Sequence, residues 1–282
     1  QRVAPGHAQA TLAQMRLALR QRDLQQLAAL QQNLQQIAPG TEAERTGRVL
    51  VELSSEAGQQ RLQQARLAAL AGRPEDALQG FKALYGDQPP TLELAVEYWR
   101  LRSAQQGQRA PAIDALRRLD DEYPGNPQLR QLLANLLFAD GQDKAALALL
   151  AKLGRNPVAT DAAAQREFEY LATRRIDDNG PKAWKSFLER YPNGRFASDA
   201  RQHLERQQRL LADPLWRAGQ DGLRLLDQGQ DEAAEAKLRL ALRGYPKDPE
   251  LLGGLGLALM RPGHRQEALV YFQRAKDNEA DI

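Results

Sequence analysis

Residues 107–146 read GQRAPAIDALRRLDDEYPGNPQLRQLLANLLFADGQDKAA and contain one full period of an internal repeat. Gly107 and Gly141 each stand five residues before an alanine, Ala112 and Ala146, and these two alanines are 34 residues apart. Each alanine opens an apolar pattern with helical spacing, and glycine readily adopts the left-handed conformation that ends a preceding helix. The segment therefore predicts a helix, a turn and a second helix as the repeating unit.

The same spacing recurs outside this segment. Three more pairs of glycine and alanine share it: Gly72 with Ala77, Gly229 with Ala234, and Gly263 with Ala268. Small residues let two helices cross closely, and large apolar residues fill the space beside the crossing. Helix pairs with this period are typical of tetratricopeptide (TPR) repeats, which stack into a right-handed superhelix. We therefore predict an all-α fold, a TPR-type α-solenoid of antiparallel helix pairs.

Two further copies are degenerate, one around Ala28 and one around Ala183. When they are included, the predicted N-terminal array covers residues 1–192, and a C-terminal TPR pair covers residues 214–282. The repeats of the array are expected near residues 8–40, 58–90, 92–124, 127–157 and 160–192.

The period breaks after each degenerate copy. The alanine of each of these copies is 49 or 51 residues from the next one, so each interval exceeds the period by about one helix. The sequence predicts an extra helix near 41–56 and an unpaired helix over 193–213. Because contacts between neighbouring repeats set the direction of a solenoid, an unpaired helix changes that direction. We expect residues 193–213 to form a hinge.

The composition excludes several classes of site. Lys and Arg number 39 against 36 Asp and Glu along the whole chain, which indicates a mixed-sign surface and no nucleic-acid partner. With no cysteine, neither a disulfide nor a thiolate metal site can form. No apolar run approaches the ~20 residues of a bilayer span, so we expect no membrane insertion by this chain. The N-terminus lacks an initiator methionine and a signal core, as expected of a processed or excised segment.

Nothing in the sequence assembles a catalytic site. His7, His203 and His264 are isolated from one another, and we expect them on the surface. Carboxylates such as Glu42 and Glu44 are expected on exposed faces, where no burial would raise their pKa for acid catalysis. We therefore predict a protein that is not an enzyme and that needs no metal and no cofactor.

The concave face of a TPR superhelix is lined by the first helix of each pair and usually receives a peptide or a helix of a partner. Counting back from the alanines places eight candidate groove residues: Gln59, Arg66, Glu97, Gln128, Gln131, Asn135, Phe138 and Trp216. The group after Pro127 is polar but uncharged, and it lacks the carboxylate clamp of TPR domains that bind chaperone tails. Such side chains can also hydrogen-bond and stack on a polysaccharide, although most exposed Gln on helices is simply solvated.

Several segments extend the similarity beyond the general repeat. They read FKALYGDQPP (81–90), LAVEYWR (94–100), PGNP (124–127) and LLFADG (136–141). These segments resemble the N-terminal periplasmic region of the bacterial cellulose synthase operon protein C family. In that family a TPR array in the periplasm is joined to an outer-membrane pore through which the glucan leaves the cell.

The resemblance implies a non-catalytic periplasmic scaffold that links the synthase complex to the outer-membrane pore. Its implied partners are protein subunits of a cellulose synthesis and export complex. Two alternatives stay open: direct guidance or binding of the glucan chain, and a TPR scaffold of another exopolysaccharide export system such as that of alginate. A cytosolic adaptor is disfavoured by the missing carboxylate clamp.

Overall fold

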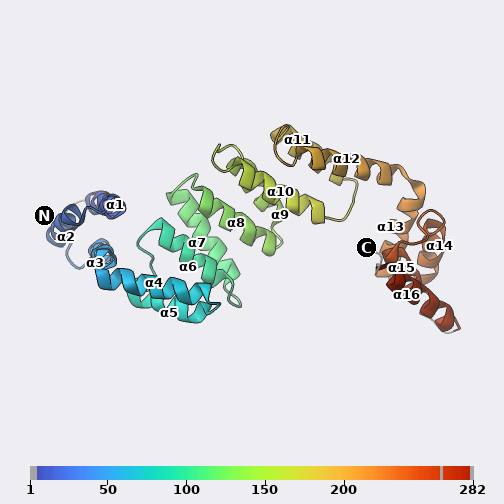
Figure 1. Ribbon diagram of the computed structural model, residues 1–282, viewed down its shortest axis with the longest axis horizontal. Coiled ribbons are helices and arrows are strands. Elements are labelled where there is room, and N and C mark those ends of the chain that lie inside the picture. Colours follow the sequence, from blue (N-terminus) through green and yellow to red (C-terminus); the bar gives the residue numbers. More distant parts are fainter. Residues whose placement is uncertain (1–4, 261–262, 280–282) are drawn as a thin grey trace. The chain divides into compact units, whose positions relative to one another are not determined.

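The computed structural model describes residues 5–260 and 263–279. Within those ranges the chain forms sixteen helices and no strand, which confirms the predicted all-α solenoid class (Figure 1). None of these described helices has an apolar stretch long enough to cross a bilayer. The chain divides into two compact units, Gln1–Ala163 and Ala164–Ile282, which we describe separately.

Most helices of the first unit pack in consecutive pairs. The helices are α1 (Pro5–Gln21), α2 (Leu24–Ile37), α3 (Glu42–Ser54), α4 (Glu56–Leu70), α5 (Pro74–Tyr85), α6 (Leu92–Ser103), α7 (Arg109–Glu122), α8 (Pro127–Ala139) and α9 (Asp143–Leu153). The pairs are α1 with α2, α4 with α5, α6 with α7 and α8 with α9, and α3 lies between the first two pairs in the sequence. Helix α10 (Thr160–Thr173) begins in the last residues of this unit. Helix α3 occupies the first segment in which the sequence period breaks.

The second unit contains the remaining helices. They are α11 (Gly180–Arg190), α12 (Ala197–Ala212), α13 (Pro214–Asp227), α14 (Asp231–Ala241), α15 (Pro249–Ala258) and α16 (Arg265–Glu279). Helix α12 occupies the second segment in which the period breaks. The predicted division into an array over 1–192, an unpaired helix over 193–213 and a pair over 214–282 stays a prediction.

The turns inside the helix pairs follow one pattern. Five glycines adopt a positive φ of 71–92° there: Gly72, Gly107, Gly141, Gly229 and Gly263. At Gly141, for example, its N–H donates to the Phe138 carbonyl at 3.1 Å and the next N–H, of Gln142, donates to Leu137 at 2.8 Å. These bonds satisfy carbonyls at the end of the first helix, as the sequence predicted from the glycines.

Small residues allow the two helices of a pair to cross closely. Ala77, Ala112 and Ala146 are fully buried in the first unit. In the second unit, a Cβ added to Gly222 would lie 2.7 Å from Leu238 Cγ, so no larger residue fits without a shift. The packing role predicted for the repeat alanines and glycines is therefore present in both units.

The first and fifth pairs differ from their predicted register. Leu27 of α2 is buried whereas Ala28 is exposed, so Leu27 takes the position that alanine fills in other pairs. In α11 the buried residues are Trp184 and Phe187, while Ala183 is only half-buried. The register predicted on Ala28 and on Ala183 was wrong. The buried positions of these two helices hold the large residues Leu27 and Trp184, whereas the other copies bury an alanine there.

Candidate interaction groove

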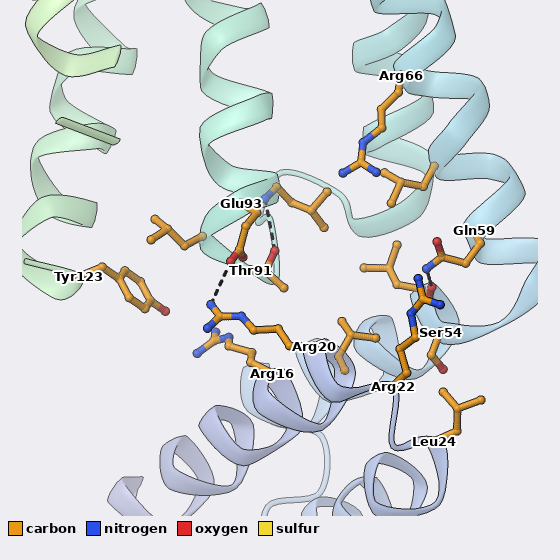
Figure 2. Close-up of a pocket in the computed structure, with 15 residues that line it drawn as sticks. Arg16, Arg20, Arg22, Leu24, Ser54, Gln59, Arg66, Thr91, Glu93 and Tyr123 are labelled. Carbon is orange, nitrogen blue, oxygen red and sulfur yellow. Dashed lines mark hydrogen bonds and ion pairs between the residues drawn. The ribbon is translucent and has the colours of Figure 1, made fainter. Parts of the chain in front are cut away.

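A groove of about 570 Å³ lies between the first helices of the N-terminal pairs (Figure 2). It is bounded by α1, α4 and α6, together with the turns that join their neighbours. Four arginines and one carboxylate, Glu93, carry the charge of its lining: Arg16, Arg20, Arg22 and Arg66. Six leucines supply its apolar surface: Leu19, Leu24, Leu53, Leu62, Leu92 and Leu94. The groove is thus basic along its walls and apolar between them.

Two arginines of α1 reach the beginning of α6. Arg20 Nη2 lies 3.0 Å from Glu93 Oε1, and Arg16 Nε donates to the Pro90 carbonyl at 2.9 Å. In Figure 2 both side chains project from α1 toward Glu93 and Tyr123. Each guanidinium has five N–H donors, so both arginines keep donors for a ligand.

Arg66 of α4 forms a bidentate ion pair at one wall of the groove. Its Nε and Nη2 donate to the two carboxylate oxygens of Glu97 at 2.9 and 2.6 Å. These hydrogen bonds raise the pKa of Arg66 above its ordinary value. The two-point geometry holds both planes in one orientation, which fixes this wall of the groove.

Arg22 stands in the turn between α1 and α2 with φ = 58°. Its N–H donates to the Leu19 carbonyl and that of Asp23 donates to the Ala18 carbonyl, the same pattern as in the turns at Gly72, Gly141 and Gly229. A side chain in this left-handed conformation costs about 1 kcal/mol relative to glycine. The Arg22 guanidinium makes no hydrogen bond or ion pair to the described residues. In Figure 2 it lies on the side of Ser54 and Gln59.

Tyr123 closes one edge of the groove at the end of α7. Burial raises the pKa of its phenol, and the nearby Arg16 opposes that shift. The phenol is therefore neutral at physiological pH and presents a hydroxyl and a ring face beside the arginines.

The structure brings three of the predicted groove residues together. Gln59 and Arg66 line the groove, and Glu97 pairs with Arg66. Gln128, Gln131 and Asn135 lie on the exposed face of α8, while Phe138 is half-buried against the cores around α8. Their assignment to a partner-binding surface stays a prediction.

Trp216 lies in the second unit, in a separate pocket of about 350 Å³. The ends of α10 and α12 and the starts of α13 and α15 line it, with His203, Gln207 and Gln220 among the side chains. Gln207 is 5% exposed, and its Oε1 has no hydrogen-bond partner among the described residues. That oxygen packs against Gly180, so the pocket itself combines the aromatic ring of Trp216 with the polar side chains around it.

Two expectations about polar residues were wrong. Glu44 is buried, at 5% exposed, where it accepts hydrogen bonds from Gln31 and Arg48. His203 is half-buried and stacks on Trp184 with ring centroids 4.8 Å apart. Both have partners within the fold that the sequence pattern does not reveal.

A buried carboxylate also escaped the sequence analysis. Glu167 of α10 is 2% exposed and pairs with Arg190, yet burial raises its pKa above the ordinary value. Its surroundings are the helix-packing core and not an open cleft. The described residues contain no group of His, Asp and Glu that could hold a metal ion.

A tetratricopeptide repeat family matches residues 103–166 of the chain. "Cellulose synthase operon protein C" of Escherichia coli (strain K12) is 32% identical over 273 residues, which are 97% of this chain and 24% of that protein. The protein of the same name from Salmonella typhimurium is 33% identical over 251 residues, covering 89% of this chain and 21% of that protein. The chain thus spans about a quarter of the length of the curated relatives it matches.

A crystal structure of the flexible tandem repeat domain from the C component of bacterial cellulose synthase is 34% identical to this chain, with a TM-score of 0.61. The match covers 74% of this chain and 86% of that domain. The chain belongs to the cellulose synthase operon protein C family. Membership in this family confirms the resemblance seen in the turn segments, and the repeat match confirms the TPR-type solenoid.

For this member of the cellulose synthase operon protein C family, most of the basic groove was not predicted from the sequence. Arg16, Arg20, Arg22 and Tyr123 were not among the predicted residues. Arg22 stands five residues before Leu27, as the turn glycines stand five residues before their alanines. With this register, Arg16 lies eleven residues before Leu27, which is the position that Arg66 has relative to Ala77. The turn residue, and not the buried small residue, is therefore the sequence signal that could have located Arg16 in the groove.

Proposed function

We propose that this chain is a non-catalytic periplasmic scaffold that binds protein subunits of a cellulose synthesis and export complex. The observation that carries the proposal is the groove between α1, α4 and α6, whose apolar surface and spare arginine donors suit a partner segment. Its family supplies the biological setting, because the relatives are named as products of a cellulose synthase operon. In this role the array would link the synthase complex to an outer-membrane pore.

Site-specific photocrosslinking in the cell envelope tests the scaffold role. A photoreactive residue at Gln59 stands in the groove, and one at Arg118, an exposed position on α7 outside the groove lining, serves as the control. We expect crosslinks to subunits of the synthesis and export complex at Gln59 and far fewer at Arg118. If neither position crosslinks to any envelope protein while the chain is folded and exported, the scaffold role is wrong.

Direct guidance of the glucan is the alternative that a specific observation supports. The pocket around Trp216 offers an aromatic side chain beside the polar side chains of Gln220 and Asp248, a combination suited to sugar rings and hydroxyls. Titration with cello-oligosaccharides, followed by tryptophan fluorescence, should quench the wild type and leave Trp216→Leu unchanged. A parallel titration with alginate oligomers distinguishes another exopolysaccharide system, and no response to either series removes this alternative.

A further inference from the structure

The charges of the N-terminal groove are unbalanced in a way that specifies a ligand. Among its lining residues, four guanidinium groups face a single carboxylate, Glu93. Glu93 is already shared with Arg20, and Arg66 is paired with Glu97 outside the lining. Arg22 makes no polar contact with the described side chains, and Arg16 donates only through Nε to a neutral carbonyl. Two of the cations in the groove therefore lack a counter-charge.

The apolar surface adds a second requirement. Leu24 stands at the start of α2 with 55% of its surface exposed, and five more leucines line the same groove. Leu53, Leu62, Leu92 and Leu94 are already buried within the fold, so Leu24 is the exposed apolar residue of the lining. A hydrophilic anion alone would leave Leu24 in water, whereas an apolar ligand would bury the arginines without compensation. The ligand that satisfies both requirements carries carboxylates and apolar side chains on one chain.

The turn residue indicates that the Arg22 charge has a use. Three other turns of the same hydrogen-bonding pattern have glycine with positive φ, at Gly72, Gly141 and Gly229, and Arg22 is the single non-glycine residue with positive φ among those described. A side chain is strained in this backbone conformation, and such outliers concentrate at functional sites. The strained turn places the Arg22 guanidinium at the edge of the groove.

We propose that the groove between α1, α4 and α6 binds an extended acidic segment of a partner protein in which glutamate or aspartate alternates with apolar residues. In an extended chain, alternate side chains point to opposite sides. Its carboxylates then pair with Arg16 and Arg20 near Glu93 and with Arg22 on the side of Ser54 and Gln59, while its apolar side chains cover Leu24. Bidentate pairing of guanidinium with carboxylate supplies the specificity. This inference rests on the proposed scaffold function and gives its partner a chemical class.

Fluorescence anisotropy with the 282-residue chain tests the inference. The probe is a fluorescein-labelled peptide of about ten residues that alternates Glu and Leu, and a Lys–Leu peptide of the same length is the matched control. We expect the Glu–Leu peptide to bind, the Lys–Leu peptide not to bind, and the affinity to fall as salt is added. Equal binding of the two peptides would overturn the inference.

Arg22→Gly is the decisive variant because it removes the charge and also the backbone strain. It should weaken the Glu–Leu complex about tenfold while making the protein more resistant to urea. Weaker binding by a more stable variant cannot be an effect of unfolding. Arg22→Lys keeps the charge but not the bidentate geometry, so it should recover only part of the affinity lost in Arg22→Gly, and the control Arg118→Gln should bind like the wild type. Unchanged binding by Arg22→Gly and by Arg20→Gln would overturn the proposal.

Two further arms separate this inference from its alternatives. In the first, a polyuronate oligomer replaces the peptide. If the oligomer binds and the Glu–Leu peptide does not, the groove is a site for acidic polysaccharide and the inference is wrong. Envelope crosslinking at Gln59 that persists undiminished in an Arg20→Gln, Arg22→Gly double variant would refute the acidic segment while leaving the scaffold function in place. Loss of that crosslink in the double variant supports the inference.

Discussion

The first helix pair, α1–α2, has the same arrangement as the later pairs but different residues at the helix crossing. At positions twelve residues apart, α1–α2 has Met15 and Leu27, whereas α4–α5 has Ala65 and Ala77. All four are buried. In the first of these two pairs both residues are large and the turn residue is Arg22, whereas in the second both are small and the turn residue is Gly72. The repeat thus tolerates large residues at the crossing when both positions change.

The largest test of this comparison is Leu27→Ala, which installs the alanine of the other pairs in the first pair. Leu27 is 1% exposed within the core of α1, α2 and α3. Because Met15 does not shrink with it, we expect a cavity and a loss of about 2–5 kcal/mol in the free energy of unfolding, measured by urea titration. A loss below about 1 kcal/mol would mean that α1 and α2 can close to the tighter crossing.

The converse test overfills a tight crossing. In Gly222→Ala the new Cβ would meet Leu238 Cγ at 2.7 Å, and we expect a loss of about 1–3 kcal/mol in urea unfolding. Gly253→Ala on α15 is the control, because its Cβ would meet no described atom within 4 Å. That variant should gain up to about 1 kcal/mol from helix propensity. Equal effects of the two substitutions would contradict close packing at Gly222.

Exchange of the turn residues has a smaller expected effect. Arg22→Gly should stabilise the chain by about 1 kcal/mol, since it relieves the left-handed backbone. Gly141→Arg should destabilise it by about the same amount, because a Cβ at Gly141 meets no described atom within 4 Å and backbone strain is the only cost. Both are read from urea midpoints. A change of the same sign in both variants would show that the two turns are not equivalent.

The smallest predicted effect concerns Glu167 and depends on pH. Burial raises its folded pKa above the ordinary 4.5, so the folded chain holds this proton more tightly than the unfolded chain. The resulting stabilisation is complete below pH 4.5 and is lost as pH rises through the folded pKa. Relative to Glu167→Gln, the wild type should therefore gain stability on acidification. Glu169→Gln, an exposed position on the same helix, is the control, and a pH-independent difference for Glu167→Gln would refute the shift.

The fold was largely predictable because its signal is periodic. Glycines at the turns and alanines at the crossings repeat with one spacing, and each has a local physical reason. The candidate groove was less predictable because the first pair breaks both rules at once, with Leu27 at the alanine position and Arg22 at the glycine position. Glu44 and Glu167 were missed for a different reason. Their burial depends on arginine and glutamine side chains from helices that the sequence alone does not bring together.

The contacts of Arg16 with Pro90 and of Arg20 with Glu93 join residues more than 70 positions apart, in a class of fold where repeats otherwise touch only their neighbours. A helix that packs against few neighbours is expected to open and close readily. Here, opening of α1 also requires release of the start of α6. Amide hydrogen exchange in α1 should consequently slow whenever the groove is occupied, so the end of the chain reports on events at its binding surface.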